Sequence, residues 1–99
     1  MKHIYFLLCM LAMAASAHSQ DYLKLMSYNI RNAKGMDNVR NVQRIANVIN
    51  NEAPDVVAVQ ELDSMTTRSN QTYVLAEIAE RTQMHASYAP AIDFQGGKY

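Results

Sequence analysis

The chain has 99 residues, with nine basic and nine acidic side chains and a formal net charge of zero at pH 7. Proteins that bind nucleic acid mainly through its phosphates carry a cluster of Lys and Arg, and the sequence shows none. The charge pattern therefore gives no support to a general nucleic-acid binder. The single cysteine, Cys9, lies near the start, so we expect no disulfide and no thiolate metal site in the rest of the chain.

The first 19 residues have the pattern of a secretory signal peptide. Lys2 supplies the positive charge, residues 4–15 form a short apolar core, and small residues follow it. Cleavage after Ala17 or after Ser19 fits the pattern equally well. The apolar core is well short of the ~20 residues that span a bilayer, so we expect no stable membrane anchor. The sequence predicts an exported protein, periplasmic or extracellular, whose mature part, residues 20–99, is one incomplete domain.

Two apolar runs have the composition of β-strands. Residues 23–30 are rich in aromatic and apolar side chains, and they lead into a polar stretch that Gly35 closes. Residues 56–59 are β-branched apart from one alanine, as in a buried strand. Asn29 lies near the end of the first run, and Glu61 follows the second. Each predicted strand therefore delivers a polar residue at its carboxyl end.

An amphipathic helix is predicted between these strands. Apolar residues recur there at steps of three and four, at Val39, Val42, Ile45, Ala46 and Ile49. Asp37 is expected to cap this helix rather than to bind metal. A strand, helix and strand in this order favour a right-handed crossover, which places the carboxyl ends of two parallel strands at one edge. Ligand sites gather at this edge of α/β sheets, so we expect Asn29 and Glu61 to face one site.

These residue types suit metal-assisted cleavage of a phosphoester. Charge develops on the phosphate oxygens during the reaction, and a hard divalent cation held by one or two carboxylates neutralises it. Glu61 suits the carboxylate role. The carboxamide of Asn29 adds no charge, but it can donate to a phosphate oxygen or orient the groups around the metal.

The segments Ser27–Arg31 and Pro54–Glu61 resemble the endonuclease/exonuclease/phosphatase superfamily, the DNase I-like phosphoesterases, and the resemblance continues to Tyr99. It implies an α/β fold, the amino-terminal part of a four-layer sandwich of two packed sheets flanked by helices. It also implies a hydrolase in which Glu61 binds catalytic Mg²⁺ or Mn²⁺ and Asn29 belongs to the same metal site. Substrates in the family range from nucleic acids to inositol phosphates and sphingomyelin, and the substrate stays open.

Other site residues of the family are not matched. Its general-base histidine, with a partnering aspartate, has no counterpart here, and His85 is expected to be structural or exposed. The alternative hypothesis is therefore a noncatalytic remnant of such a domain. Arg31 and Arg68 can each meet a substrate phosphate, because a guanidinium pairs with two phosphate oxygens, but a solvated or ion-paired surface side chain is the alternative for both.

The remaining sequence predicts less regular structure. Residues 64–71 are polar and turn-like, and the pattern of apolar residues predicts a second helix over 73–84. A third strand is expected near 86–92, followed by a turn over 93–97 and a strand that begins at Lys98. Helices on one face of so few strands would leave the other face apolar and unpaired.

Overall fold

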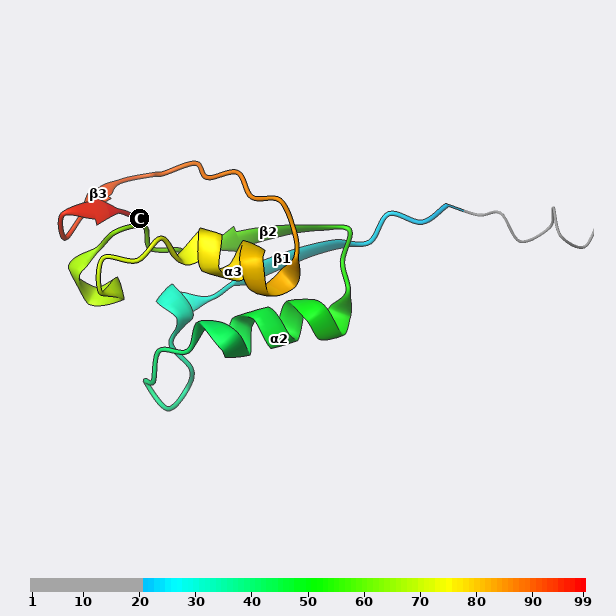
Figure 1. The fold of residues 1–99 in the computed structure, drawn as a ribbon, viewed down its shortest axis with the longest axis horizontal. Coiled ribbons are helices and arrows are strands. Elements are labelled where there is room, and N and C mark those ends of the chain that lie inside the picture. The colour runs from blue at the N-terminus through cyan, green and yellow to red at the C-terminus, as the bar shows by residue number, and fades with distance from the viewer. Residues whose placement is uncertain (1–20) are drawn as a thin grey trace, which may run out of the picture.

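The computed structural model describes residues 21–99, which form a small mixed α/β domain with two helices and two small sheets. Its elements in chain order are β1 (Leu25–Asn29), the 3₁₀ turn η1 (Arg31–Ala33), α2 (Val42–Glu52), β2 (Val56–Gln60), the 3₁₀ turn η2 (Thr67–Ser69), α3 (Val74–Thr82), β3 (Asp93–Phe94) and β4 (Gly97–Lys98), shown in Figure 1. The predicted signal peptide over 1–19 lies outside the described residues. Neither helix of the described part is long and apolar enough to cross a membrane.

The predicted pair of parallel strands is confirmed. β1 pairs with β2 from Leu25 opposite Val56 to Asn29 opposite Gln60, and α2 connects the two strands. One face of this sheet packs on the core through Met26, Tyr28, Val57 and Val59. On the other face Leu25 and Val56 are 67% and 53% exposed. The sheet is thus covered on one side within the described residues, as predicted.

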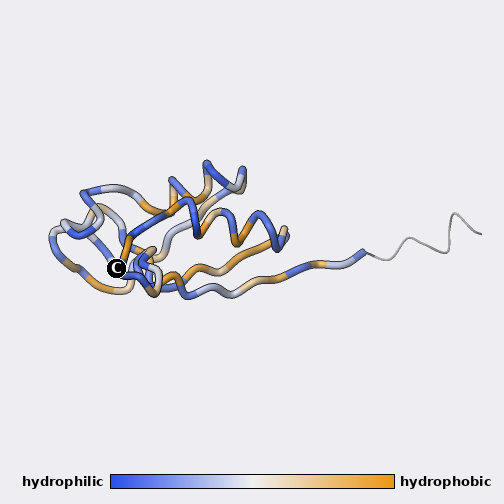
Figure 2. The backbone as a smooth tube through the Cα atoms, turned by 90° about the horizontal axis from the view of Figure 1, so that it is seen from below, coloured by the Kyte–Doolittle hydropathy of each residue, from blue (hydrophilic) through white to orange (hydrophobic). Residues whose placement is uncertain are grey.

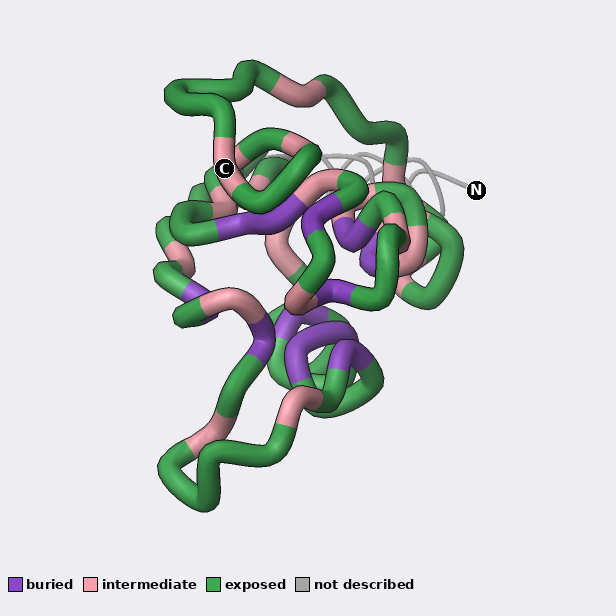
Figure 3. The backbone as a smooth tube through the Cα atoms, turned by 90° about the vertical axis from the view of Figure 1, so that its left-hand side faces the viewer, coloured by how far each residue is buried: buried purple, intermediate pink, exposed green. Residues whose placement is uncertain are grey.

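The hydrophobic core lies between this sheet and the two helices. Its buried residues are Ile30, Ala33, Val42, Ile45, Ile49, Leu62, Val74 and Ile78. Figure 2 shows apolar residues recurring with the turns of the helices, and Figure 3 shows the buried residues gathered in the interior. α2 and α3 pack against each other, and Asn50 Nδ2 donates to the carbonyl oxygen of Arg81 at 3.1 Å. The apolar periodicity of the sequence therefore marks the faces that are buried.

The expected cap of the first helix is wrong. α2 begins at Val42, and its cap is Asn41, whose side chain accepts from the backbone N–H of Arg44 at 3.2 Å. Asp37 instead accepts from the backbone N–H of Val39 at 3.0 Å and pairs with the Arg44 guanidinium at 3.0 Å. The hydrogen bonds from Arg44 lower the pKa of Asp37, and Asp37 raises the pKa of Arg44. Asp37 closes the loop before the helix, while Val39 stays exposed.

The third strand expected near 86–92 is also wrong. Residues 84–92 contain no helix or strand and form an arch from the end of α3 back to β3 (Figure 1). Pro90 lacks a backbone N–H, and no strand of the described residues lies alongside this segment to form a ladder. The arch is tied at its end, where the backbone N–H of Tyr99 donates to the carbonyl oxygen of Ile92 at 2.9 Å.

The turn expected over 93–97 is a short antiparallel hairpin of β3 and β4, with residues 95–96 at its tip. Lys98 of β4 also exchanges backbone hydrogen bonds with Ser64, at 2.8 and 2.9 Å. Gly97 permits this approach, because a Cβ atom there would lie 2.1 Å from the Ser64 carbonyl oxygen. The hairpin is thereby fixed to the segment that leaves β2, and the chain that follows β4 lies close to the edge of the main sheet.

Candidate functional site

The carboxyl ends of β1 and β2 lie at one edge of the sheet, where Asn29 and Glu61 were predicted to meet. Asn29 is opposite Gln60, so Glu61 comes one residue past this pair. The carbonyl oxygen of Glu61 accepts from the backbone N–H of Asn32 at 2.8 Å, which joins the segments that leave the two strands. Both Asn29 and Glu61 are exposed. The structure thus brings these two residues to the same edge.

Glu61 has a left-handed backbone, with φ of 56°. Residues other than glycine adopt this conformation at a cost of roughly 1–2 kcal/mol. Arg31, Asn32 and Ala33, just after β1, also have positive φ angles. The chain therefore turns sharply after each strand.

The side chain of Asn29 is oriented by the backbone two residues later in the chain. Its Oδ1 accepts from the backbone N–H of Arg31 at 3.0 Å, and its Nδ2 makes no hydrogen bond within residues 21–99. The carboxamide oxygen keeps a second lone pair, and the Nδ2 group can still donate. Asn29 lines a small cavity of about 300 Å³ beside α2, whereas Glu61 lines a different and larger groove. Asn29 and Glu61 therefore lie at the same edge of the sheet but line separate cavities.

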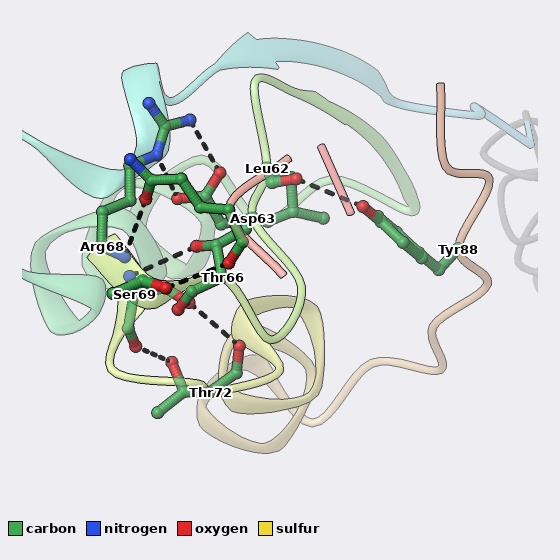
Figure 4. Close-up of polar contacts among 9 residues, drawn as sticks. Leu62, Asp63, Thr66, Arg68, Ser69, Thr72 and Tyr88 are labelled. Carbon is green, nitrogen blue, oxygen red and sulfur yellow. Dashed lines mark hydrogen bonds and ion pairs between the residues drawn. The ribbon is translucent and has the colours of Figure 1, made fainter. Parts of the chain in front are cut away.

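The larger groove has a volume of about 880 Å³ and lies between β2, α3 and the segment 83–91. Its wall is mostly apolar, with Glu61 and Tyr99 among its polar residues. His85 also lines the groove, is exposed as predicted, and makes no hydrogen bond with other described residues. The Tyr88 hydroxyl donates to the Leu62 carbonyl oxygen at 3.4 Å, which holds the arch against the end of β2 (Figure 4).

Both arginines considered for phosphate binding contact protein groups. The Arg31 guanidinium donates to the Gly35 carbonyl oxygen and to Asn38 Oδ1, each at 3.3 Å. Arg68 donates through Nε and Nη2 to the two carboxylate oxygens of Asp63, at 2.7 and 2.8 Å (Figure 4). A phosphate contact by either arginine stays a prediction, and it would compete with these bonds.

The Asp63 side chain is fully buried, whereas that of Arg68 is 29% exposed. Hydrogen bonds from Arg68 to Asp63 raise the pKa of the guanidinium. The same guanidinium lies 4.5 Å from the ring centroid of Phe94 and 4.7 Å from that of Tyr99. Arg68 therefore joins a buried carboxylate to two aromatic side chains of the hairpin region.

The loop that carries Arg68 is held by buried polar groups. Thr66 and Ser69 are fully buried, and Ser69 Oγ donates to the Thr66 carbonyl oxygen at 3.0 Å. Thr72 Oγ1 donates to the Ser69 carbonyl oxygen at 2.7 Å (Figure 4). Because buried polar groups in this loop are satisfied by one another, the loop has a defined shape. That shape sets the position of Arg68.

The ring of Tyr99 lies beside the Arg68 guanidinium, and Tyr99 lines the same groove as Glu61. Burial raises the pKa of the Tyr99 phenol, the negative charge of Glu61 raises it further, and the hydrogen bond with Arg68 lowers it. The sequence pattern indicated no role for Asp63 or Tyr99. The one local signal for Asp63 was a basic residue, Arg68, five positions later in the sequence. No local signal existed for Tyr99.

A divalent cation fits this edge only in part. No three His, Cys, Asp or Glu side chains come together within residues 21–99 in a way that would hold a metal. Mg²⁺ usually keeps several waters and takes one or two carboxylates from the protein. Glu61 supplies one exposed carboxylate, and Asn29 supplies a carboxamide at the same edge. Among the described residues, these two would hold or orient such an ion.

In comparisons with known proteins, no family model, no curated protein and no solved structure matches the chain.

Proposed function

We propose that residues 20–99 belong to an exported, divalent-metal-dependent phosphoester hydrolase of the endonuclease/exonuclease/phosphatase superfamily. In this proposal the described α/β domain is part of a DNase I-like four-layer sandwich. The observation that carries the proposal is the position of Asn29 and Glu61 at one edge of the sheet. Asn29 is the last residue of β1, and Glu61 is the first residue after the parallel strand β2. The exposed position of Glu61 supports the same conclusion. So does the resemblance of the segments around both residues to that superfamily.

Each residue has a distinct role in this proposal. Glu61 binds Mg²⁺ or Mn²⁺ with its carboxylate, and the ion, when bound, neutralises charge on the phosphate oxygens. Asn29 donates from Nδ2 to a phosphate oxygen, because its Oδ1 already accepts from the Arg31 backbone. The second lone pair of Asn29 Oδ1 stays free to hold or orient the metal ion. The substrate is a phosphoester of a nucleic acid, an inositol phosphate or a lipid.

Cation binding tests this proposal directly. Mn²⁺ added to the ¹⁵N-labelled chain should broaden the amide signals of residues close to Glu61 and Asn29, because the ion is paramagnetic. Glu61→Gln should abolish the selective broadening. Glu80→Gln is the matched control, because Glu80 is an exposed glutamate on α3. Broadening that is the same in the Glu61→Gln variant would refute the assignment of the metal site.

A second candidate is a noncatalytic remnant of the same kind of domain. The observation that favours it is the lack of a paired base: His85 is the one histidine among residues 21–99, and it makes no hydrogen bond there. On this account the 99-residue chain does not cleave bis(4-nitrophenyl) phosphate with Mg²⁺, and Glu61→Ala changes nothing. A Mg²⁺-stimulated rate that Glu61→Ala abolishes would exclude this candidate.

A further inference from the structure

β2 has a free edge that borders the larger groove. β1 pairs along one edge of β2, and no other strand of residues 21–99 pairs along the opposite edge. Every residue of β2 lines the groove, whose far wall is the segment 83–91. Proteins usually protect a strand edge with charged residues, proline or a bulge, because an open edge pairs readily with another strand. β2 has neither a charged residue nor a proline, so its free edge is open to a further strand.

The unpaired groups at this edge are the backbone N–H and C=O groups of Val57 and Val59. The carbonyl oxygen of Gln60 accepts from the backbone N–H of Ile30 at 3.0 Å, so Gln60 and every second residue before it bond with β1. In a parallel ladder the residues between them direct their N–H and C=O groups to the opposite side. Val57 and Val59 line the groove, and their backbone groups have no partner within residues 21–99.

The far wall of the groove also lacks a backbone partner. Residues 85–90 of the arch make no backbone hydrogen bond with other described residues. The arch is held in place at both sides of this stretch, by Met84 at the end of α3 and by Ile92, which bonds with Tyr99. The Tyr88 hydroxyl adds a bond to the Leu62 carbonyl oxygen. A strand in the groove would therefore lie between two fixed backbones, each with unpaired groups.

The groove has acidic residues at both ends of β2. Asp55 comes just before β2 and Glu61 just after it, and both line the groove and are exposed. No Lys or Arg among the described residues lines it. The side chains of Lys24 and Arg68 pair with other carboxylates, so they leave both of these charges for a partner. Charge complementarity therefore favours an occupant with a basic residue at each end.

We propose that the groove binds an extended segment of another polypeptide, which adds to β2 as a further strand. The segment has Lys or Arg at both ends and apolar side chains between them, which pack on the wall formed by Leu75, Ile78 and Met84. In this mode of recognition, main-chain hydrogen bonds provide the affinity and side-chain pockets provide the specificity. This inference goes beyond the proposed function and does not depend on a metal ion.

The test follows amide exchange in the ¹⁵N-labelled 99-residue chain, with EDTA present and a synthetic peptide added. The probe is a capped peptide with Lys at both ends and alternating Val and Thr between them. At free peptide about ten times the dissociation constant, exchange at Val57 and Val59 should slow about 10-fold. In the free chain, exchange at Ala58 should already be slower than at these two residues, because its N–H lies in the ladder with β1.

Two matched peptides separate the backbone from the charges. A copy with N-methyl groups on its central residues keeps the side chains but loses the backbone donors, so it should give no protection. A copy with Glu at both ends should bind more weakly. In the protein, the double variant Asp55→Asn, Glu61→Gln should weaken binding of the Lys peptide about 3- to 10-fold. Glu80→Gln is the control and should change nothing, because Glu80 lies outside the groove.

The outcomes decide between this occupant and others. Equal protection by the N-methylated copy would show that strand pairing is wrong, and so would no protection at millimolar peptide. Equal binding of the Lys and Glu peptides would overturn the basic partner. If Val57 and Val59 are already protected in the free chain, and sedimentation gives the mass of a dimer, a second copy fills the edge and the inference is also wrong.

Discussion

Replacing Arg68 by methionine should destabilise the domain more than any surface substitution. The Asp63 carboxylate is fully buried and accepts two hydrogen bonds from Arg68, at 2.7 and 2.8 Å. Without the guanidinium this charge has no partner and no water. Removing one partner of a buried ion pair costs about 3–5 kcal/mol. Lost contacts with the rings of Phe94 and Tyr99 add roughly 0.5–2 kcal/mol.

The opposite substitution, Asp63→Asn, should cost less. The Arg68 side chain is 29% exposed, so it can turn toward water when its partner loses charge. Loss of hydrogen bonds to a charged group costs roughly 1.5–3 kcal/mol. Burial therefore sets the order of the two effects. Arg68→Met leaves the buried Asp63 carboxylate without a partner, so this variant should be less stable than Asp63→Asn.

Urea unfolding at pH 7, followed by far-ultraviolet circular dichroism, measures both effects as differences in the free energy of unfolding. A domain of about 80 residues has roughly 4–12 kcal/mol of stability, so Arg68→Met removes a large share of it. Lys34→Met is the control, because Lys34 is exposed and its side chain has no partner within residues 21–99, and it should change the stability by no more than about 0.5 kcal/mol. The reasoning fails if Arg68→Met costs less than Asp63→Asn, or no more than the control.

Three further outcomes test the backbone description. Glu61→Gly relieves the left-handed strain at φ of 56°, so it should leave the free energy of unfolding unchanged or raise it by up to about 1 kcal/mol. The selective Mn²⁺ broadening should disappear in this variant. A clear loss of stability would contradict the prediction. Gly97→Ala places a Cβ atom 2.1 Å from the Ser64 carbonyl oxygen, so the amide protons of the hairpin should exchange with solvent faster, and unchanged protection would count against this contact. Asn41→Ala should lower the urea-derived stability by about 1 kcal/mol through loss of the α2 cap, and Asp37→Ala by less; the reverse order would restore Asp37 as the cap.

The local pattern of the sequence predicted most of the main sheet and both helices. Apolar residues at steps of three and four marked the buried side of α2, and the β-branched run marked β2. Predictions from the local pattern failed where contacts with other segments of the chain decide the structure. Residues near 86–92 were expected to form a strand, but among the described residues the backbone of Tyr99 alone is hydrogen-bonded to this segment, at Ala91 and Ile92, and it does not make a ladder. Asp37 and Asn41 are both good caps, and the loop geometry selected Asn41.

The candidate site divides in the same way. Asn29 and Glu61 were placed at one edge from the order of two strands and a helix, because parallel strands end at the same side. Asp63 and Tyr99 were missed because their importance comes from contacts across the chain. Tyr99 reaches Arg68 only after the arch and the hairpin have brought the chain back toward the segment that follows β2. No local spacing signals such a contact.

By itself, the sequence determined the two parallel strands, the two helices, and the two polar residues at the carboxyl ends of these strands. These features depend on neighbours three to five positions apart, so periodicity and composition encode them. Only the tertiary structure decided that Arg68 binds a buried carboxylate and that the ring of Tyr99 lies beside this guanidinium. It also decided that Asn29 and Glu61 face different cavities. Such contacts depend on the path of the whole chain in space, which the order of residue types along a segment does not specify.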